Sequence, residues 1–267
     1  MRSAWIFAKR YFFALGSCIY LFSLGWLRGR NRALMAAIGS HFGVETPMVG
    51  LELPEITAEA LLGDPAPVRI PEPTPRDGNV SALESLVIAG LAASCAPASC
   101  FEFGTFDGRS TLTLAANCGP AARIFTLDLP ADQLEATGLR LEHADRAYVD
   151  KPLVGARLLG RPEAGRVTQL LGDSATFDFT PYYDRIDFVF VDGAHAYDYV
   201  ISDSRHALKM LPSGRGVILW HDYGGWPGVT RALNHLRASD PEFTDLRHIA
   251  GTSLACLIRR KGAPDHS

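Results

Sequence analysis

The sequence predicts a doubly wound, Rossmann-like α/β fold with a seven-stranded, mostly parallel sheet. After residue 80, short apolar runs alternate with segments of helical spacing. The runs are mainly apolar and do not alternate strictly with polar residues, which is typical of parallel strands that helices cover on both faces. Two further runs near the C-terminus predict an antiparallel strand pair in the same sheet.

Residues 1–40 predict an apolar helical segment with basic flanks. Residues 11–27 carry no charge and have cations on both sides, namely Lys9, Arg10, Arg28 and Arg30. As a helix they would reach ~25 Å, slightly short of a bilayer core of roughly 30 Å. Membrane association through residues 11–27 and packing of this helix on protein therefore both stay open. No A-x-A-like cleavage site follows directly, which disfavours a removed signal peptide.

A proline-rich connector, residues 41–79, is expected next. Residues 64–78 contain five prolines, and each proline fixes φ and removes a backbone donor, so this stretch predicts extended chain. Ser81 and Glu84 then form an S-x-x-E capping box ahead of apolar residues at helical spacing. A helix therefore opens the main domain, which we place at residues 80–260.

The elements of the main domain are expected in alternating order. The predicted strands are 99–103, 123–127, 167–171, 186–191, 217–220, 247–250 and 254–258. The predicted helices between strands are 110–116, 131–148 and 197–211. Residues 261–267 are expected to form a flexible tail.

Charge and cysteine usage exclude several classes of protein. The net charge is −3, and subtracting the six cations of residues 1–40, which contain no acid, leaves −9 for residues 41–267. An acidic main domain argues against a nucleic-acid partner. The five cysteines show no C-x-x-C spacing, which argues against a disulfide framework or zinc site. We expect a cytoplasmic protein, in solution or on the cytoplasmic face of a membrane.

The stretch FEFGTFDGRS predicts a ligand-binding turn after the first strand of the main domain. Gly104 and Gly108 allow a tight turn and a close approach of ligand to backbone. The spacing is not that of a phosphate fingerprint, because Phe106 stands where G-x-G-x-x-G has its middle glycine. Glu102, two positions before Gly104, would repel a pyrophosphate and attract a cationic or amino-bearing ligand.

Two more acids follow the next strands. Asp128 ends the second strand, twenty residues after Gly108, where a carboxylate can accept hydrogen bonds from both ribose hydroxyls. Asp173 and Ser174, in LLGDS, follow the third strand at the same edge of the sheet. Each acid alone would be interpreted as a helix cap. Together with Glu102 they predict a nucleoside pocket that avoids phosphate.

In order along the chain, these motifs resemble those of class I S-adenosylmethionine-dependent methyltransferases. The segments that carry the resemblance are FEFGTFDGRST, TLDL, LLGDS, DFVFVDGAHAYDYV and GVILWHDYG. They are most similar to the branch with a D-G-x-H-x-Y signature, which includes macrocin-type and cephalosporin-hydroxylase-like O-methyltransferases. The resemblance covers roughly residues 80–258 and implies S-adenosyl-L-methionine as the cofactor.

The resemblance also implies which residues contact the cofactor. Glu102 and Gly104 would contact the methionine end, and Asp128 would contact the ribose. Asp173 and Ser174 would contact the adenine. The other implied cofactor-binding residues are Thr105, Gly108, Ser110 and Asp192.

The ends of the fourth and fifth strands predict the site of methyl transfer, with Asp192 and His195 as catalytic residues. His221 and Asp222 follow the fifth strand, and adjacent parallel strands lie about 4.8 Å apart, so these side chains can converge. In one interpretation Asp192, His221 and Asp222 bind Mg²⁺ or another divalent cation, which would lower the pKa of a substrate hydroxyl. The imidazole leaves the identity of the metal open. In the other interpretation His195 alone is the general base and an acid orients it.

The predicted reaction is transfer of a methyl group to a hydroxyl of a small molecule or glycan. Two alternatives stay open. An NAD-dependent, Rossmann-type oxidoreductase would have the middle glycine and no acid ahead of the turn. A non-catalytic nucleoside-binding module would not need Asp192, His195 and Asp222 together.

Overall fold

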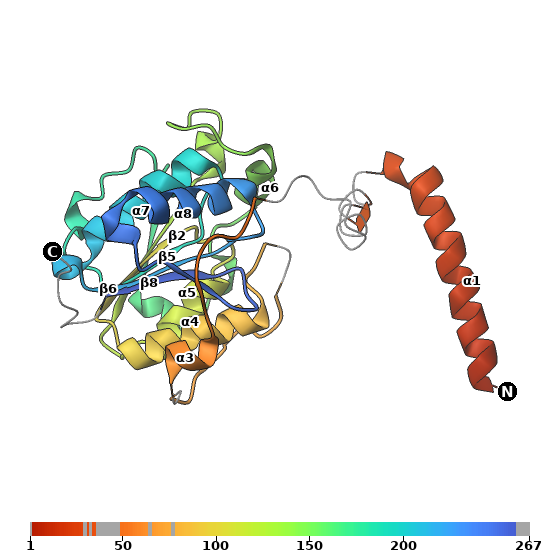
Figure 1. The fold of residues 1–267 in the computed structure, drawn as a ribbon, viewed down its shortest axis with the longest axis horizontal. Helices are drawn as coiled ribbons and strands as arrows, with labels where there is room; N and C mark the ends of the chain where they lie inside the picture. Colours follow the sequence, from red (N-terminus) through yellow and green to blue (C-terminus); the bar gives the residue numbers. More distant parts are fainter. Residues whose placement is uncertain are drawn as a thin grey trace. The chain divides into compact units, whose positions relative to one another are not determined.

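The computed structural model describes residues 2–28, 31, 34–35, 49–63, 66–75 and 78–259. The chain divides into two units, Met1–Met48 and Val49–Ser267. The first unit contains α1 (Arg2–Ser23), drawn in red in Figure 1, and a short 3-10 helix, Gly25–Leu27. Among the described residues, no helix is both long enough and apolar enough to cross a membrane. The predicted tail, residues 261–267, lies outside the described residues.

The second unit is a layered α/β domain built on one mostly parallel sheet. In the described part of the chain the sheet has eight strands in the order β1-β7-β8-β6-β5-β2-β3-β4. The strands are β1 (Glu55–Ile56), β2 (Ser99–Phe103), β3 (Arg123–Asp128), β4 (Val167–Leu171), β5 (Phe188–Val191), β6 (Gly216–Trp220), β7 (Arg247–Ile249) and β8 (Ala255–Arg259). β8 is antiparallel to both β6 and β7. The predicted fold class is therefore confirmed.

The strand count differs from the prediction because the stretch expected as connector adds β1. The two residues of β1 pair in parallel with β7, in the register Glu55↔His248 and Ile56↔Ile249. So short a strand has no periodicity to detect, which is why the sequence predicted seven strands instead of eight. The hydroxyl of Tyr223 accepts hydrogen bonds from the amides of Glu52 (2.8 Å) and Leu53 (3.0 Å), which fixes the chain ahead of β1.

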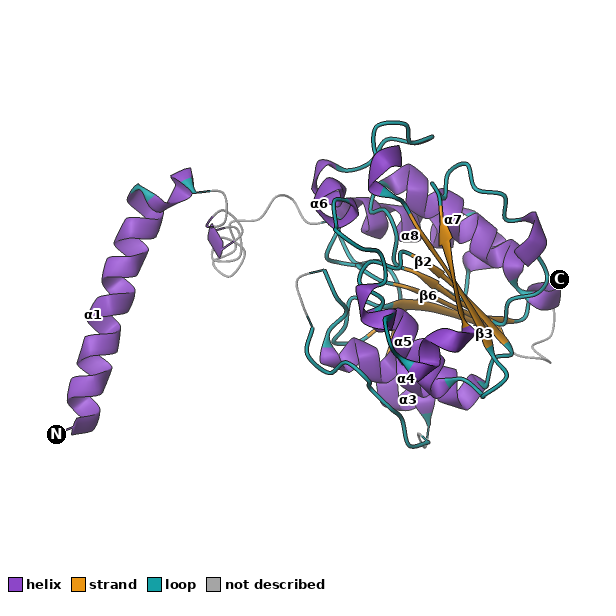
Figure 2. Cartoon of the chain, turned by 180° about the vertical axis from the view of Figure 1, so that it is seen from behind, coloured by secondary structure: helices purple, strands orange, loops and turns teal. Residues whose placement is uncertain are grey.

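Helices cover both faces of the sheet, as Figures 1 and 2 show. One face is covered by α3 (Ala58–Leu62), α4 (Ala82–Cys95) and α5 (Arg109–Asn117), and the other by α7 (Tyr197–Met210) and α8 (Pro227–Ser239). Two apolar cores result, one on each side of the sheet. All residues of β2 and β5 are buried, which explains their apolar composition.

The predicted capping box of α4 is present. Ser81 Oγ accepts a hydrogen bond from the amide of Glu84 (3.2 Å), and Glu84 Oε2 accepts one from the amide of Ser81 (2.6 Å). The described part of the proline-rich stretch, residues 66–75, forms neither helix nor strand. The buried Arg109 side chain donates hydrogen bonds to the carbonyl of Glu72 in this stretch (2.7 Å) and to the carbonyl of Val80 ahead of α4 (2.6 Å).

The helix predicted over residues 131–148 does not form. In its place lie the 3-10 turns Ala131–Gln133 and His143–Asp145 and the single helical turn α6 (Arg146–Val149). In this stretch side-chain carboxylates accept hydrogen bonds from backbone amides. The amide of Gly138 donates to Asp173 (2.6 Å), and the amide of Glu142 donates to Asp145 (3.1 Å). Such local hydrogen bonds compete with helix formation.

One long helix was not predicted, although its signals are present in the sequence. α8 has Pro227 at its first position, and the buried Val229, Leu233 and Leu236 follow at helical spacing.

The strand order shows where along the sheet a ligand is expected to bind. From β2 the chain passes to β3 and β4 on one side, whereas β5 and β6 lie on the other. The switch point therefore falls between β2 and β5, where Phe103 is paired with Val191. Ligands of open α/β sheets bind beyond the carboxyl ends of the strands at such a point.

Candidate active site

A cavity of about 340 Å³ lies at the carboxyl ends of the strands around the switch point. It is lined by eight of the predicted site residues, namely Gly104, Asp128, Asp173, Ser174, Asp192, His195, His221 and Asp222. The other four, Glu102, Thr105, Gly108 and Ser110, do not line it. The residues predicted for the cofactor and those predicted for catalysis thus meet in one cavity.

Gly104 is required by a close approach of the neighbouring strand. Its φ is +90°, and a Cβ atom there would lie 1.9 Å from the carbonyl oxygen of Asp192. The amide of Asp192 in turn donates to the carbonyl of Phe103 (2.9 Å). The sequence predicted that Gly104 admits a ligand to the backbone. The structure adds a close contact with the end of β5, which brings Asp192 to the turn, and Gly104 also lines the cavity.

Three other residues of the FEFGTFDGRS stretch shape the turn from outside the cavity. Gly108, with φ +89°, precedes α5, and a Cβ there would lie 3.0 Å from Leu158 Cγ. The hydroxyls of Thr105 and Thr126 are 2.7 Å apart and hydrogen-bonded. Thr105 and Ser110 line a small adjoining recess of about 10 Å³. These residues support the turn but do not face the main cavity.

Glu102 lies inside the domain, beneath the cavity. It is fully buried, and its Oε2 accepts hydrogen bonds from the hydroxyls of Thr111 and of Thr126 (2.6 Å). Its Oε1 is buried and has no hydrogen-bond partner in the described part of the chain. Burial raises the pKa of Glu102 to about 7, and hydrogen bonds from hydroxyl groups offset only part of that rise.

Asp128 ends β3 as predicted, and both of its carboxylate oxygens have partners. Oδ2 accepts from the amide of Phe106 (2.6 Å), and Oδ1 accepts from the ammonium group of Lys151 (2.7 Å). Burial raises the pKa of Asp128, whereas the charge and the hydrogen bond of Lys151 act against that rise. Lys151 also lines the cavity, so this part of its wall carries a paired acid and base.

Asp173 and Ser174 lie at the end of the cavity formed by β4 and α7. Asp173 accepts from the hydroxyl of Tyr199 (2.8 Å) and the amide of Ala175 (3.0 Å). Asp203, on α7, also lines the cavity and is 1% exposed, and no described residue forms a hydrogen bond with its Oδ1. Burial raises the pKa of Asp203 to about 8, a hydrogen bond from Ser174 lowers it, and the nearby Asp173 charge raises it further.

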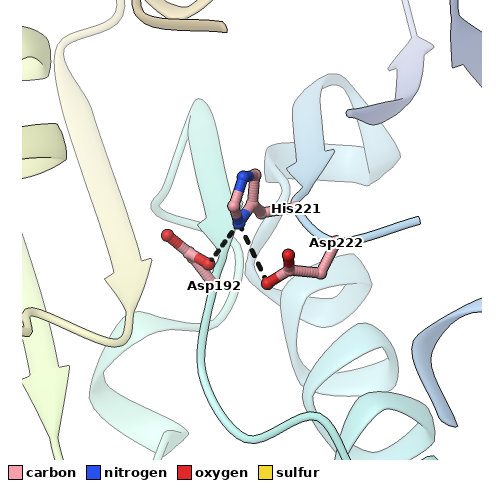
Figure 3. Close-up of side chains that lie close together, drawn as sticks. All are labelled: Asp192, His221 and Asp222. Carbon is pink, nitrogen blue, oxygen red and sulfur yellow. Dashed lines mark hydrogen bonds and ion pairs between the residues drawn. The ribbon is translucent and has the colours of Figure 1, made fainter. Parts of the chain in front are cut away.

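Asp192, His221 and Asp222 form a cluster at the ends of β5 and β6. Figure 3 shows the imidazole of His221 between the two carboxylates, with Nδ1 at 2.9 Å from Asp192 Oδ1 and 3.0 Å from Asp222 Oδ2. One potential ligand atom from each residue lies within 4.8 Å of the others. Burial alone would lower the pKa of His221, but the charges of Asp192, Asp222 and Glu84 hold it well above its usual range.

His195 lies between two acids at the same edge. Its Nδ1 is hydrogen-bonded to Asp145 Oδ1, and its Nε2 lies 2.8 Å from Asp222 Oδ2. Burial alone would lower the pKa of His195, but these two carboxylates raise it to about 9. The indole of Trp226 stacks on the imidazole, with ring centroids 3.9 Å apart and planes inclined by 13°. The ring is therefore fixed in position and surrounded by polar and aromatic groups.

One family model matches part of this domain. Residues 101–223 of the chain are similar to the family described as a methyltransferase domain. The resemblance to class I methyltransferases is thereby confirmed, whereas the D-G-x-H-x-Y branch stays a prediction. No curated protein matches the chain.

Several solved structures resemble the methyltransferase domain. The O-methyltransferase TomG from Streptomyces achromogenes, in complex with SAM and involved in tomaymycin synthesis, is 23% identical, with TM-score 0.48 over 69% of this chain and 83% of that one. The SAH-bound methyltransferase PaMTH1 from Podospora anserina is 18% identical, with TM-score 0.46 over 69% and 81%. An O-methyltransferase from Bacillus cereus in complex with SAH is 17% identical, with TM-score 0.44 over 69% and 84%.

The sequence did not predict several polar residues that line the cavity from outside the strand ends. Asp145, Tyr148 and Lys151 come from the stretch wrongly predicted as helix or from just after it, and Asp203 comes from the middle of α7. A long loop has no periodicity that would indicate which of its side chains face inward. Asp203 carried one usable signal, since an acid at a buried position of an amphipathic helix is unusual.

Proposed function

We propose that this chain is an S-adenosylmethionine-dependent O-methyltransferase that acts on a hydroxyl group of a small molecule or a sugar. The observation that carries the proposal is the convergence of Asp128, Asp173 and Asp192 in one cavity with the histidines of β5 and β6. Carboxylates at the switch point disfavour a pyrophosphate and favour a cationic, phosphate-free nucleoside. The match to a methyltransferase domain supports the same ligand and argues against the NAD-dependent alternative.

The residues present fit such a cofactor. Asp203 Oδ1 is a buried oxygen without a partner in the cavity wall, and an amino group of the ligand would satisfy it. Asp128 would accept hydrogen bonds from ribose hydroxyls, and Asp173 with Ser174 would face the adenine. Asp192 would lie near the sulfonium, where its negative charge is favourable. S-adenosylmethionine, when bound, supplies the electrophilic methyl group.

We further propose that Asp192, His221 and Asp222 hold a divalent cation. Their ligand atoms lie within 4.8 Å of one another, which two carboxylates and one imidazole around a single ion require. One imidazole in the set suits Mn²⁺, Fe²⁺ or Zn²⁺ better than Mg²⁺. Such an ion would lower the pKa of a bound acceptor hydroxyl.

His195 is proposed as the group that takes the acceptor proton, acting in its neutral form, which becomes populated as the pH approaches its pKa of about 9. Asp145 holds its Nδ1, so Nε2 is the nitrogen directed toward Asp222 and the cavity. Trp226 stacks against the ring and limits its rotation. Alignment of the acceptor oxygen with the methyl group would supply most of the rate enhancement, on the order of 7–11 kcal/mol.

Calorimetry and methyl-transfer assays test the proposal. The full-length protein should bind S-adenosylhomocysteine and not NAD, and it should transfer labelled methyl groups to one member of a panel of phenols and sugars. Asp192→Asn should abolish transfer while S-adenosylhomocysteine still binds. Binding of NAD in preference to S-adenosylhomocysteine would overturn the proposal. Transfer that survives removal of divalent cations by chelation would leave His195 as the base without a metal.

A further inference from the structure

We propose that α1 binds the surface of a membrane that contains anionic lipids, and that it lies in the interface without crossing the bilayer. The proposal concerns the first unit of the chain alone and does not depend on the proposed enzymatic activity. It accounts for a feature that methyl transfer leaves unexplained, namely a helix with many large apolar side chains exposed between Trp5 and Phe22.

The exposed apolar side chains of α1 are too many and too large for an ordinary solvated helix. Scattered exposed apolar residues need no explanation, but a contiguous set of this size marks a site of interaction. The set comprises Trp5 (68% exposed), Ile6, Phe7 (71%), Tyr11, Phe12 (68%), Phe13 (78%), Leu15, Ile19 (64%), Tyr20 and Phe22. Aromatic side chains dominate it, and they are the residues that favour the membrane–water interface.

The order of residues in α1 gives the helix one continuous apolar stripe. Trp5, Phe12 and Ile19 are spaced by seven, with Ala8, Leu15 and Phe22 between them at intervals of three or four, so all six share this stripe. Arg10 and Ser17 lie on the opposite side, which they share with the exposed Ile6 and Phe13. Lys9 lies at the edge of the stripe, where its alkyl chain can cover apolar surface while the ammonium group reaches water. Because Lys9 and Arg10 interrupt the apolar surface, the helix fits the interface, where both cations stay in water, better than the bilayer core.

Charge favours a lipid surface over a second protein chain as the partner. Residues 1–40 carry six cations and no acid, while residues 41–267 carry −9. An anionic membrane would attract the first unit and repel the rest, which keeps the methyltransferase domain in water. In a parallel pair of α1 helices the cations of both copies would repel each other.

The position of Lys9 and Arg10 explains why α1 does not span. After them, only residues 11–23 of α1 are uncharged, which is ~20 Å of helix against a bilayer core of roughly 30 Å. The helix is too short beyond its cations to cross, in agreement with the finding that no described helix qualifies as a span.

Flotation with lipid vesicles tests the proposal in the full-length protein. The protein should float with vesicles of phosphatidylcholine and phosphatidylglycerol, and weakly or not at all with phosphatidylcholine alone. Phe12→Ser with Ile19→Ser should weaken binding at least about tenfold, because two buried apolar side chains are lost. Lys9→Gln with Arg10→Gln should weaken binding to anionic vesicles by about fivefold per charge. Leu153→Ser with Leu159→Ser, at exposed apolar positions of the methyltransferase domain, is the matched control and should bind unchanged.

Thiol labelling separates the lipid surface from other partners of α1. Cys18 on α1 and Cys95 on α4 are both exposed, so a water-soluble maleimide should label both without vesicles. Anionic vesicles should protect Cys18 alone. Protection of Cys18 in the absence of vesicles would show that α1 packs on protein and would overturn the proposal. Resistance of the bound protein to alkaline extraction would mark a spanning helix and would also overturn the proposal. Vesicle binding that is unchanged in the variant Phe12→Ser with Ile19→Ser would overturn it as well.

Discussion

Two groups of acids in and beside the cavity have pKa values that are shifted in opposite directions. Asp222 accepts hydrogen bonds from His195 and His221, and although burial alone would raise its pKa, these partners hold it well below the usual range. Glu102 and Asp203 have no cationic partner among the described residues, and burial raises their pKa values to about 7 and about 8. Partners rather than position decide whether a carboxyl at this edge is charged.

The comparison divides the work of the site. The charged acids face the histidines, where a cation or an ionising hydroxyl would be stabilised, whereas Asp203 lines the proposed cofactor side of the cavity and Glu102 lies buried beneath it. Replacing an acid by its amide should therefore be severe in the first group and mild or even stabilising in the second.

The largest effect is expected for Asp222→Asn. The amide cannot supply the negative charge that both histidines face, so kcat should fall by about 10²–10⁴-fold. The affinity for S-adenosylhomocysteine should change little, because Asp222 lies on the acceptor side of the cavity. Labelled methyl transfer measures the first quantity and calorimetry the second, with the exposed Asp132→Asn as control. Normal turnover by the Asp222→Asn variant would show that methyl transfer does not need the negative charge of Asp222.

Glu102→Gln should change how the free energy of unfolding depends on pH. The pKa of Glu102 is about 7 when folded and near 4.5 in its ordinary state, so the unfolded chain loses this proton first as pH rises. The free energy of unfolding of the wild type should therefore fall between pH 4.5 and 7 and then level off. This fall should be larger in the wild type than in Glu102→Gln by up to about 3 kcal/mol. Urea unfolding at low and high pH measures the difference.

The matched control for that experiment is Glu59→Gln, at an exposed position of α3, which should follow the wild type at every pH. Parallel curves for the wild type and Glu102→Gln would mean that Glu102 titrates normally, and the two groups of acids would then no longer differ.

The sequence predicted the sheet and the acids at its edge because both depend on local patterns. Apolar runs gave β2 to β8, and the residues at or directly after the ends of five of these strands supplied Gly104, Asp128, Asp173, Asp192 and Asp222. A strand end fixes where the next side chain lies, so the prediction needs no knowledge of distant contacts.

The protonation states and the covering loop could not be predicted in this way. Asp145 reaches His195 across 50 residues of chain and Lys151 reaches Asp128 across 23, and nothing in the local sequence marks either pair. Most of the segment that carries both was predicted as helix, because its composition suits a helix while its amides bond to side chains. Contacts made only after folding decide the pKa values as well.

Asp145→Asn tests whether this loop contributes to the charged group of acids. Asp145 is one of the two carboxylates that raise the pKa of His195, so its loss should lower that pKa and reduce kcat by about 10–100-fold. The rise of kcat with pH should move to lower pH, while S-adenosylhomocysteine affinity is kept. Asp150→Asn, in the same loop but exposed, should behave as wild type. A lower kcat at all pH values together with lost cofactor binding would indicate a purely structural role.

The smallest effect is expected for Asp203→Asn. At pH 7 Asp203 should be protonated, since burial raises its pKa to about 8, and an amide of the same size should change S-adenosylhomocysteine affinity by less than about threefold. At about pH 9 the wild type should be less stable than the variant, because a raised folded pKa costs unfolding free energy as pH rises. Calorimetry measures the affinity for S-adenosylhomocysteine, and urea unfolding measures the free energy of unfolding. Asp198→Asn, at an exposed position, is the control. A large loss of affinity at pH 7 would place Asp203 with the charged acids, and burial without a cationic partner would then not suffice to neutralise a carboxyl at this edge.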